Sequence, residues 1–406
     1  MNRKILFYLP FIKLGGIERV SIEYLNGLIS KGYKVDLIID FDMGKDGNTF
    51  EYAIPKGVNF QYIKSKKVSR FIYIFRTLGK KNKIFNIFLY GFMILFDFYF
   101  YHTKVKKIIK KENYDYTISF YQFLPAYLTS IKKTKHIVWL HGSVEHFFGG
   151  IKNIFKNNYG KKLDRYDYIV TIADEMKEQI EDYYPDIEKN KIKRIYNPFD
   201  FDNMKEKSNN TSELGAEEKG LLSDDFICTV TRIDEHQKDL TTLILAYEKL
   251  FQENKINDKL YIIGDGPSKD ELEAKVKEKK LDKNILFLGN KTNPFIWIKN
   301  SKIFILSSKF EGLPTVLIES MAMNTFIISS NCKTGPKEIL KDGGCGDLFE
   351  IGNVDELSQK INFTLNNDNY RNDKINKASK RILEFSNESI LNELDILLNI
   401  KRGETQ

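Results

Sequence analysis

Two glutamates flank a stretch of backbone that is suited to binding phosphate. Glu311 follows a predicted buried strand over Ile303–Leu306, and Glu319 lies about two turns into the helix that Pro314 begins. The N–H groups and the positive dipole end of that helix favour an anion at its N-terminus. One carboxylate before the anion site and one beside it suit a ligand with a central diphosphate and hydroxyl groups at both ends. A nucleoside-diphosphate sugar has this shape; two solvated glutamates on an ordinary strand–loop–helix unit are the alternative.

Two cations lie together on a second loop. Arg232 and Lys238 follow the predicted strand Phe226–Val230 and are six residues apart. A guanidinium can bind two phosphate oxygens at once and an ammonium adds a point charge, so this pair can neutralise a diphosphate. A solvated basic loop is the alternative interpretation.

Glycines occur where two strands are followed by helices. Gly15 and Gly16 precede a predicted helix over Ile17–Ser30, and Gly266 follows the predicted strand Leu260–Ile263. Glycine lets backbone N–H groups approach a phosphate or a sugar closely. Neither site has the G-x-G-x-x-G spacing of a dinucleotide-binding loop, so the glycines alone are also consistent with ordinary turns.

One histidine, His141, lies just past the end of the predicted strand Ile137–Leu140. A lone histidine in this position is more often structural than catalytic. Two short Asp-x-Asp matches begin at Asp40 and Asp200, but such matches arise easily by chance in a chain this rich in acids. Because two cations and a helix dipole can balance a diphosphate, the sequence predicts metal-independent chemistry with no cofactor.

The stretch from Glu311 to Glu319 resembles the signature of retaining glycosyltransferases of family 4, also called glycosyltransferase group 1. The resemblance rests on the seven residues between the glutamates and on the residues after the first of them, Gly312-Leu313-Pro314-Thr315. The segment Ser329–Leu340 is similar to bacterial members that build capsule, O-antigen or lipid-linked oligosaccharides. The resemblance implies a GT-B fold and transfer from a nucleotide sugar, with UDP-hexose or UDP-N-acetylhexosamine expected as the donor.

The resemblance also assigns roles to the acidic and basic residues. Glu311 would hold donor-sugar hydroxyls and stabilise positive charge at the anomeric carbon, and Glu319 would bind the ribose hydroxyls. Arg232 and Lys238 would bind the phosphates together with backbone N–H groups between Gly312 and Val316. The acceptor would attack on the face that the phosphate leaves, with no protein nucleophile.

Further donor contacts follow from the same resemblance. They are the glycine loop at Gly15 and Gly16, the turn at Gly266, the base-reading loop at Asn290 and Lys291, and His141 near the sugar. Thr231 and Asp239 depart from the family pattern because glycine or another small residue is common there, which leaves the conformation of the Arg232 loop in question.

Alternating strands and helices predict an α/β protein with two Rossmann-like domains, whose parallel sheets face a central cleft. At 406 residues the chain is long enough for two cores. We place an acceptor-binding domain at residues 1–200, a nucleotide-sugar-binding domain at 201–385, and a last helix at 386–406 that packs back on the first domain. The polar stretch Lys205–Ser223 marks the boundary.

The net charge of +8 is concentrated in residues 64–111. There, basic clusters flank an apolar, aromatic segment at residues 84–101. This pattern fits a helix in an anionic membrane interface, a buried helix with a basic entry, or, less well, a membrane span. No nucleic-acid-binding motif accompanies the basic residues. Three cysteines without metal-ligand spacing, and no cleavable signal, predict free thiols in the cytoplasm, with peripheral attachment to the inner membrane surface as an option.

Two other functions remain open from the sequence. A nucleotide-sugar epimerase would share the two-domain fold but would lack the loop with spaced glutamates. A non-catalytic partner subunit that binds sugar nucleotides would keep the fold, although the four charged residues Glu311, Glu319, Arg232 and Lys238 are all present. The expected partners are therefore a nucleotide-sugar donor and a lipid-linked or glycan acceptor, with no nucleic acid.

Overall fold

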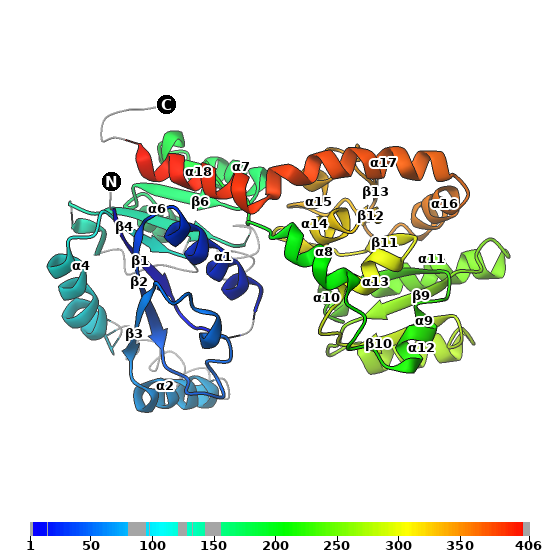
Figure 1. Cartoon of the computed structure of the whole chain (residues 1–406), viewed down its shortest axis with the longest axis horizontal. Coiled ribbons are helices and arrows are strands. Elements are labelled where there is room, and N and C mark those ends of the chain that lie inside the picture. The colour runs from blue at the N-terminus through cyan, green and yellow to red at the C-terminus, as the bar shows by residue number, and fades with distance from the viewer. Residues whose placement is uncertain are drawn as a thin grey trace. The chain divides into compact units, whose positions relative to one another are not determined.

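The computed structural model describes residues 3–13, 15–79, 95–96, 98–120, 128–131, 133–142 and 156–400 (Figure 1). The chain forms two compact units. The first contains the chain up to Ile172, Lys177–Phe199 and the chain from Ile390 on, and the second contains Ala173–Met176 and Asp200–Ser389. Each is built on a parallel sheet with helices, which confirms the predicted α/β class with two Rossmann-like domains.

Within the described residues, the first unit has a seven-stranded parallel sheet in the order β3-β2-β1-β4-β5-β6-β7. Its strands are β1 (Lys4–Leu9), β2 (Lys34–Phe41), β3 (Asn59–Lys64), β4 (Tyr116–Ser119), β5 (Lys135–Leu140), β6 (Tyr168–Thr171) and β7 (Ile192–Arg194). Nearly every residue of β1, β4 and β5 is buried. Strands buried on both faces read as continuous apolar runs, which is why the sequence located them well.

In the part that the structure describes, the first unit contains helices between successive strands and, after the last strand of the chain, α18. They are α1 (Gly16–Ser30), α2 (Lys66–Gly79), α4 (Lys106–Glu112), α6 (Lys156–Leu163), α7 (Asp174–Tyr183) and α18 (Asn387–Asn399). A π-helical turn at Tyr101–Val105 precedes α4. The buried side of α1 carries Ile22, Leu25 and Leu28, at the spacing expected for one face of a helix.

The second unit has, among the described residues, six parallel strands in the order β10-β9-β8-β11-β12-β13. They are β8 (Phe226–Val230), β9 (Lys259–Ile263), β10 (Ile285–Gly289), β11 (Ile303–Leu306), β12 (Phe326–Ser330) and β13 (Asp347–Phe349). The helices are α8 (Phe201–Asn209), α9 (Ala216–Leu221), α10 (Glu235–Lys238), α11 (Leu240–Gln252), α12 (Lys269–Glu278), α13 (Phe295–Asn300), α14 (Thr315–Ala322), α15 (Pro336–Ile339), α16 (Val354–Leu365) and α17 (Asp368–Arg381). Apolar residues of β8, β9, β11, β12, α11 and α16 form one continuous core.

The polar stretch Lys205–Ser223 contains the last part of α8 and the whole of α9, instead of a linker without secondary structure. The side chain of Asp200 caps α8 by accepting a hydrogen bond from the backbone N–H of Asn203 at 3.0 Å. Ser208 is the buried residue of α8, so the helix has little apolar periodicity for a sequence-based prediction to detect.

The last helix, α18, packs against the first unit and lies beside α1 in Figure 1. Its buried residues are Ile390, Leu394, Leu397 and Leu398. The hydroxyl of Tyr33 donates to Asp395 at 2.6 Å, and the hydroxyl of Tyr116 donates to the carbonyl of Leu398, also at 2.6 Å. The helix therefore completes the core of a unit whose other elements lie more than 180 residues earlier.

The basic segment at residues 64–111 falls partly outside the described residues, which include neither 80–94 nor 97. Lys64, at the start of this basic segment, is fully buried. Its ammonium donates to both carboxylate oxygens of Asp40, at 2.7 and 2.8 Å. A buried ammonium needs such a partner because burial would otherwise leave its charge uncompensated. In the described part of the chain, no helix is both long and apolar enough to cross a bilayer.

Candidate active site

The second unit brings Glu311 and Lys238 into direct contact. Glu311 lies on the loop after β11, and Lys238 is the last residue of α10 after β8. These two strands are neighbours in the sheet, so their carboxyl ends meet at one edge. The Lys238 ammonium donates to Oε1 of Glu311 at 2.6 Å, and the two side chains are only 15% and 9% exposed. The predicted diphosphate-binding cation and the predicted sugar-binding carboxylate therefore form one shielded ion pair.

Arg232 lies on the same loop as Lys238 but in a different environment. Its guanidinium is 67% exposed and pairs with Asp234 at 3.5 Å. The loop packs closely on the turn at Gly266, where an added Cβ would come within 2.2 Å of the carbonyl oxygen of Ile233. Glycine is therefore required at position 266, and its role in this structure is to let the two loops approach.

The helix predicted after Glu311 is present as α14, with Pro314 at its N-cap position. Leu313 and Pro314 are buried, whereas Glu311, Gly312, Thr315 and Glu319 are partly exposed at this edge of the unit. Gly335 packs directly on Pro314, since a Cβ on Gly335 would lie 2.4 Å from the proline ring. With a φ of 101°, Gly335 also adopts a conformation that favours glycine. The predicted phosphate-binding stretch is therefore held by a second loop, which follows β12.

Asn290 and Lys291, which were predicted to lie on the loop that reads the base, differ in their contacts. Asn290 is exposed after β10. The Lys291 ammonium pairs with Glu218 at 2.6 Å and lies 5.5 Å from the ring centre of Trp297. These contacts bind Lys291 to α9 and α13, so its side chain holds the loop in place, and the backbone is left as the group that can contact a base.

In the first unit, the predicted site residues lie at the carboxyl ends of the sheet. Gly15 is the N-cap of α1 and Gly16 is its first residue, directly after the loop that follows β1. The carboxylate of Glu18 folds back over Gly15, where a Cβ would lie 2.5 Å from Oε2. Burial raises the pKa of Glu18, opposed in part by its own backbone N–H and by Lys13.

His141 follows β5 and lies over a cluster of buried rings. Its ring centre is 4.6 Å from that of Phe120, and Phe120 packs in turn on Trp139 at 5.3 Å. Burial lowers the pKa of His141 to about 4, although a hydrogen bond with the backbone of Phe120 opposes the shift. Its Nε2 atom is buried and has no hydrogen-bond partner among the described residues. A neutral imidazole with one uncommitted nitrogen can bind a hydroxyl group.

Several polar residues that support the site were not predicted. The hydroxyl of Ser308 donates to Oε1 of Glu311 at 2.6 Å, and the hydroxyl of Thr334 donates to the carbonyl of Glu311. Burial, followed by the charge of Glu311, raises the pKa of the Cys332 thiol to about 12, so this cysteine is not a nucleophile. The available signal was the Ser307-Ser308 pair at the end of a buried strand, which places hydroxyls beside the first glutamate.

The two Asp-x-Asp matches have structural roles. Asp40 pairs with buried Lys64, and Asp200 caps α8. All three cysteines, Cys228, Cys332 and Cys345, are free, as predicted, and they are also buried. The described residues contain no group of three or more His, Cys, Asp or Glu side chains arranged to hold a metal ion.

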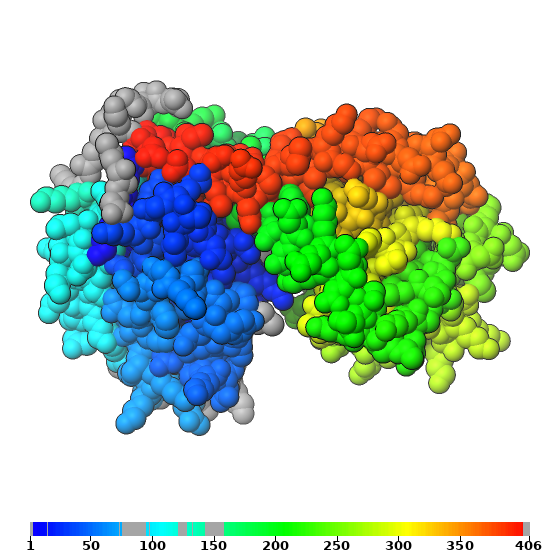
Figure 2. Space-filling model, in the orientation of Figure 1, coloured from blue at the N-terminus to red at the C-terminus, as the bar shows by residue number. Residues whose placement is uncertain are grey.

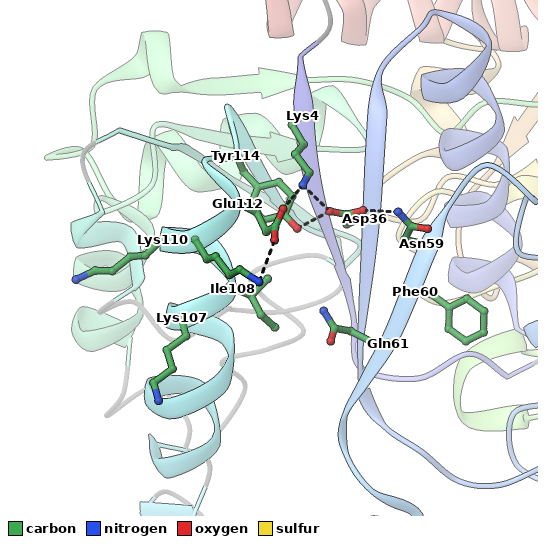
Figure 3. A pocket seen from close by; sticks show the side chains of 11 residues that line it. Lys4, Asp36, Asn59, Phe60, Gln61, Lys107, Ile108, Lys110, Glu112 and Tyr114 are labelled. Atoms are coloured by element: carbon green, nitrogen blue, oxygen red, sulfur yellow. Dashed lines mark hydrogen bonds and ion pairs between the residues drawn. The ribbon is translucent and has the colours of Figure 1, made fainter.

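One large cavity is separate from these residues. It has a volume of about 870 Å³ and lies at the amino ends of β1, β2 and β3 (Figure 3). Lys4 bridges Asp36 at 3.2 Å and Glu112 at 2.7 Å, while Lys107 and Lys110 point away from the strands. Ligands of open parallel sheets bind outside the carboxyl ends of the strands, so we do not assign the donor to this cavity.

Comparison with known proteins identifies the family. The model of "Glycosyltransferase Family 4" matches residues 14–203, and that of "Glycosyl transferases group 1" matches residues 216–381. The chain belongs to the family 4, group 1 glycosyltransferases. The recognition made from the glutamate-spaced loop is thereby confirmed, and the two models together account for both units of this glycosyltransferase.

Two relatives come from Campylobacter jejuni. One is an N-acetylgalactosamine-N,N'-diacetylbacillosaminyl-diphospho-undecaprenol 4-alpha-N-acetylgalactosaminyltransferase, 35% identical over 48% of this chain and 50% of that protein. The other is a GalNAc-alpha-(1->4)-GalNAc-alpha-(1->3)-diNAcBac-PP-undecaprenol alpha-1,4-N-acetyl-D-galactosaminyltransferase, 26% identical over 98% of this chain and 99% of that protein. The first match therefore spans only half of its relative. Among solved structures, Anabaena HepE in complex with UDP has a TM-score of 0.72 at 16% identity and covers 97% and 99% of the two chains. That likeness confirms the GT-B fold.

Proposed function

We propose that this glycosyltransferase moves a hexose or N-acetylhexosamine from a UDP-sugar to a lipid-linked or glycan acceptor, with retention of the anomeric configuration. The observation that carries the proposal is the contact between Glu311 and Lys238 beside the N-terminus of α14. It places a carboxylate, an ammonium and backbone N–H groups within one small region. These are the groups that a sugar joined to a diphosphate requires.

The geometry supports a division of labour between the two charges. When a donor binds, its β-phosphate competes with Glu311 for the Lys238 ammonium. Glu311 is then available for the hydroxyls of the sugar and for the positive charge that develops at the anomeric carbon. The bond from that carbon to the phosphate oxygen breaks, the acceptor oxygen bonds to the same face, and the leaving phosphate accepts the acceptor's proton.

The proposed reaction does not require a metal ion. Lys238, Arg232 and the first turn of α14 together offer positive charge and N–H donors to a diphosphate. Asp40 and Asp200, the first carboxylates of the two Asp-x-Asp matches, are engaged elsewhere in the fold. We therefore expect donor binding and turnover that are insensitive to EDTA.

The proposed acceptor is a polyprenyl-diphosphate-linked sugar presented at the inner membrane surface. The two Campylobacter relatives carry a diphospho-undecaprenol or PP-undecaprenol in their names. On α2 the side chains of Lys66, Lys67 and Arg70 are exposed beside Phe71 and Ile74, which are 43% and 47% exposed. Figure 2 shows the blue surface over β3 and α2 adjoining the cyan surface over α4, which carries exposed Lys107, Lys110 and Lys111. Basic and apolar side chains on one helix face suit an anionic lipid interface.

The donor is tested by thermal unfolding with UDP, GDP, ADP and TDP, each with and without EDTA. A nucleotide at one hundred times its Kd should stabilise the protein by about 2.7 kcal/mol. We expect UDP to be the nucleotide that stabilises, EDTA to have no effect, and Glu319→Ala to abolish the shift. Glu271→Ala, an exposed glutamate on α12, is the matched control.

Catalysis is tested by product analysis. Glu311→Ala should bind UDP but lose about 10²–10³ in kcat, as for other removed stabilisers of transition-state charge. An unchanged kcat in Glu311→Ala would contradict the site assignment. A wild-type protein that binds UDP yet transfers no sugar to any lipid-linked acceptor would favour a non-catalytic partner subunit.

The membrane surface is tested by sedimentation with vesicles that contain anionic lipid. Replacing Lys66, Lys67 and Arg70 by alanine should weaken binding, and raising the salt concentration should do the same. Replacing the exposed lysines Lys255, Lys277 and Lys377 of the second unit is the control with the same change of charge. Equal vesicle binding by both triple variants would argue against α2 as the contact.

A further inference from the structure

Lys309 lies between the two loops that carry the charged residues of the site. It follows β11 and precedes Glu311 by two residues. Its backbone N–H donates to the carbonyl of Gln237 at 2.7 Å, and its ammonium donates to the carbonyl of Glu235 at 3.2 Å. The ammonium also pairs with Asp239 at 3.6 Å. One residue of the Glu311 loop therefore contacts three residues of the segment that carries Lys238.

The segment that carries Lys238 is short and ends at a residue with an unusual backbone conformation. The helix α10 has only four residues, and Asp239 ends it with a φ of 46° and a ψ of 48°. Left-handed backbone is unfavourable for most residues other than glycine, and aspartate and asparagine are among those that adopt it more often. Asp239 is also buried, and its carboxylate accepts a hydrogen bond from Thr242 at 2.8 Å. The Lys309 ammonium lies where it offsets the buried charge of an aspartate in this unusual conformation.

Two further hydrogen bonds join the same loops beside the contacts of Lys309. The hydroxyl of Ser307 donates to the carbonyl of Lys238 at 2.8 Å, and the side-chain amide of Gln237 donates to the carbonyl of Phe310 at 3.2 Å. Lys309 is the charged member of this set. It is also 42% exposed, so its replacement should cost little global stability.

We propose that Lys309 is a positioning residue, which holds α10 against the Glu311 loop so that Lys238 and Glu311 keep the separation needed for sugar transfer. This inference rests on the proposed function, because Lys238 and Glu311 are the groups whose geometry it sets. Lys309 acts through the backbone of Glu235 and the carboxylate of Asp239. Loop misplacement of about 1 Å is enough to lower the rate of a chemical step strongly.

The test compares Lys309→Met, which keeps the apolar stem and loses the ammonium, with Lys309→Arg. Lys255→Met is the control, since Lys255 is 51% exposed and pairs with Glu253 at 2.7 Å away from the site. Lys309→Met should lower kcat about tenfold and change the Kd for UDP less than about threefold, because positioning affects the transition state most. Lys309→Arg should recover most of the loss, and Lys255→Met should behave as wild type.

A double-mutant cycle separates positioning from a general structural role. If Lys309 acts through Lys238, adding Lys309→Met to Lys238→Met should lower kcat by less than about twofold further. If the loss of kcat in the double variant equals the product of the losses in the two single variants, the proposal is overturned. A kcat for Lys309→Met equal to that of the active wild type would also overturn it.

Hydrogen–deuterium exchange tests the contact without any assay of activity. Amides in residues 235–239 should exchange faster in Lys309→Met than in wild type or Lys255→Met. Unchanged exchange would overturn the inference even in an active enzyme. If the wild type transfers no sugar but residues 235–239 still exchange faster in Lys309→Met, the proposed function is contradicted. The role of Lys309 in holding α10 is then still supported.

Discussion

At the scale of single residues, the buried ring nitrogen of His141 predicts that the stability of the fold depends on pH. Its pKa is about 4 in the folded protein, against 6.5 for the unperturbed group, because burial disfavours the charged form. Between pH 6.5 and pH 4 the unfolded chain binds a proton that the folded protein does not. Stability should therefore fall as the pH is lowered through this window, by about 2 kcal/mol at pH 5 relative to pH 7.5.

Urea unfolding of wild type and His141→Gln at both pH values isolates this contribution. His136, whose pKa burial also lowers, is present in both proteins and cancels in the comparison. The variant should lose less stability on acidification than wild type. The same loss in both proteins would mean that His141 is not held in its neutral form.

Residue types and spacing predicted which loops carry the candidate site, but not how their side chains pair. Lys238 and Glu311 are 73 residues apart in the chain, and only the sheet order of β8 and β11 brings them to 2.6 Å. Burial was equally invisible for Lys64, since a lysine in a basic stretch reads as a surface residue until its partner Asp40 is placed. Local pattern predicts backbone structure, whereas pairing across the sheet depends on the topology.

At the scale of elements, the contact of α1 with α18 depends on Gly27. A Cβ at this position would lie 2.2 Å from a methyl group of Leu391 on α18, whereas a Cβ on Gly220 in α9 would meet nothing within 4 Å. Replacing a helical glycine by alanine normally stabilises by roughly 0.5–1 kcal/mol. We expect that gain for Gly220→Ala, and a net loss of about 1 kcal/mol for Gly27→Ala because of overpacking.

Thermal or denaturant unfolding of the two alanine variants measures the difference. Leu391→Ala, added to Gly27→Ala, should reduce the cost of the Gly27 substitution because the clashing methyl groups are removed. If the Gly27→Ala variant is as stable as the Gly220→Ala variant, then α18 can shift on α1 without a cost in stability.

Strands that are buried on both faces are among the elements that the sequence predicted well. Strands such as Ile303–Leu306 are apolar throughout and were placed correctly. The short edge strand β13, with only three residues, and the polar helix α17 carry no comparable signal. Capping by Asp200 and packing on other helices form α8 in a stretch that composition alone assigns to a linker.

At the scale of the whole molecule, the first unit is not a continuous piece of chain, because α18 returns to it from the other end. A fragment of residues 1–200 therefore lacks the helix that covers α1 and supplies Ile390, Leu394, Leu397 and Leu398 to the core. Burying a large apolar side chain stabilises by about 1.5–3 kcal/mol, so losing four of them should remove a large part of the fragment's stability.

We expect residues 1–200 alone to unfold at a lower temperature, and to aggregate more readily, than the same fragment joined by a flexible linker to residues 387–406. The matched control carries asparagine at Leu394, Leu397 and Leu398, which keeps the length of the added segment but removes three of its four buried apolar side chains. It should be no more stable than residues 1–200, since the linker and the polar face of the helix supply no core. Equal Tm values for all three proteins would mean that the seven-stranded sheet and its other helices are sufficient, and that α18 is an accessory to the unit instead of part of its core.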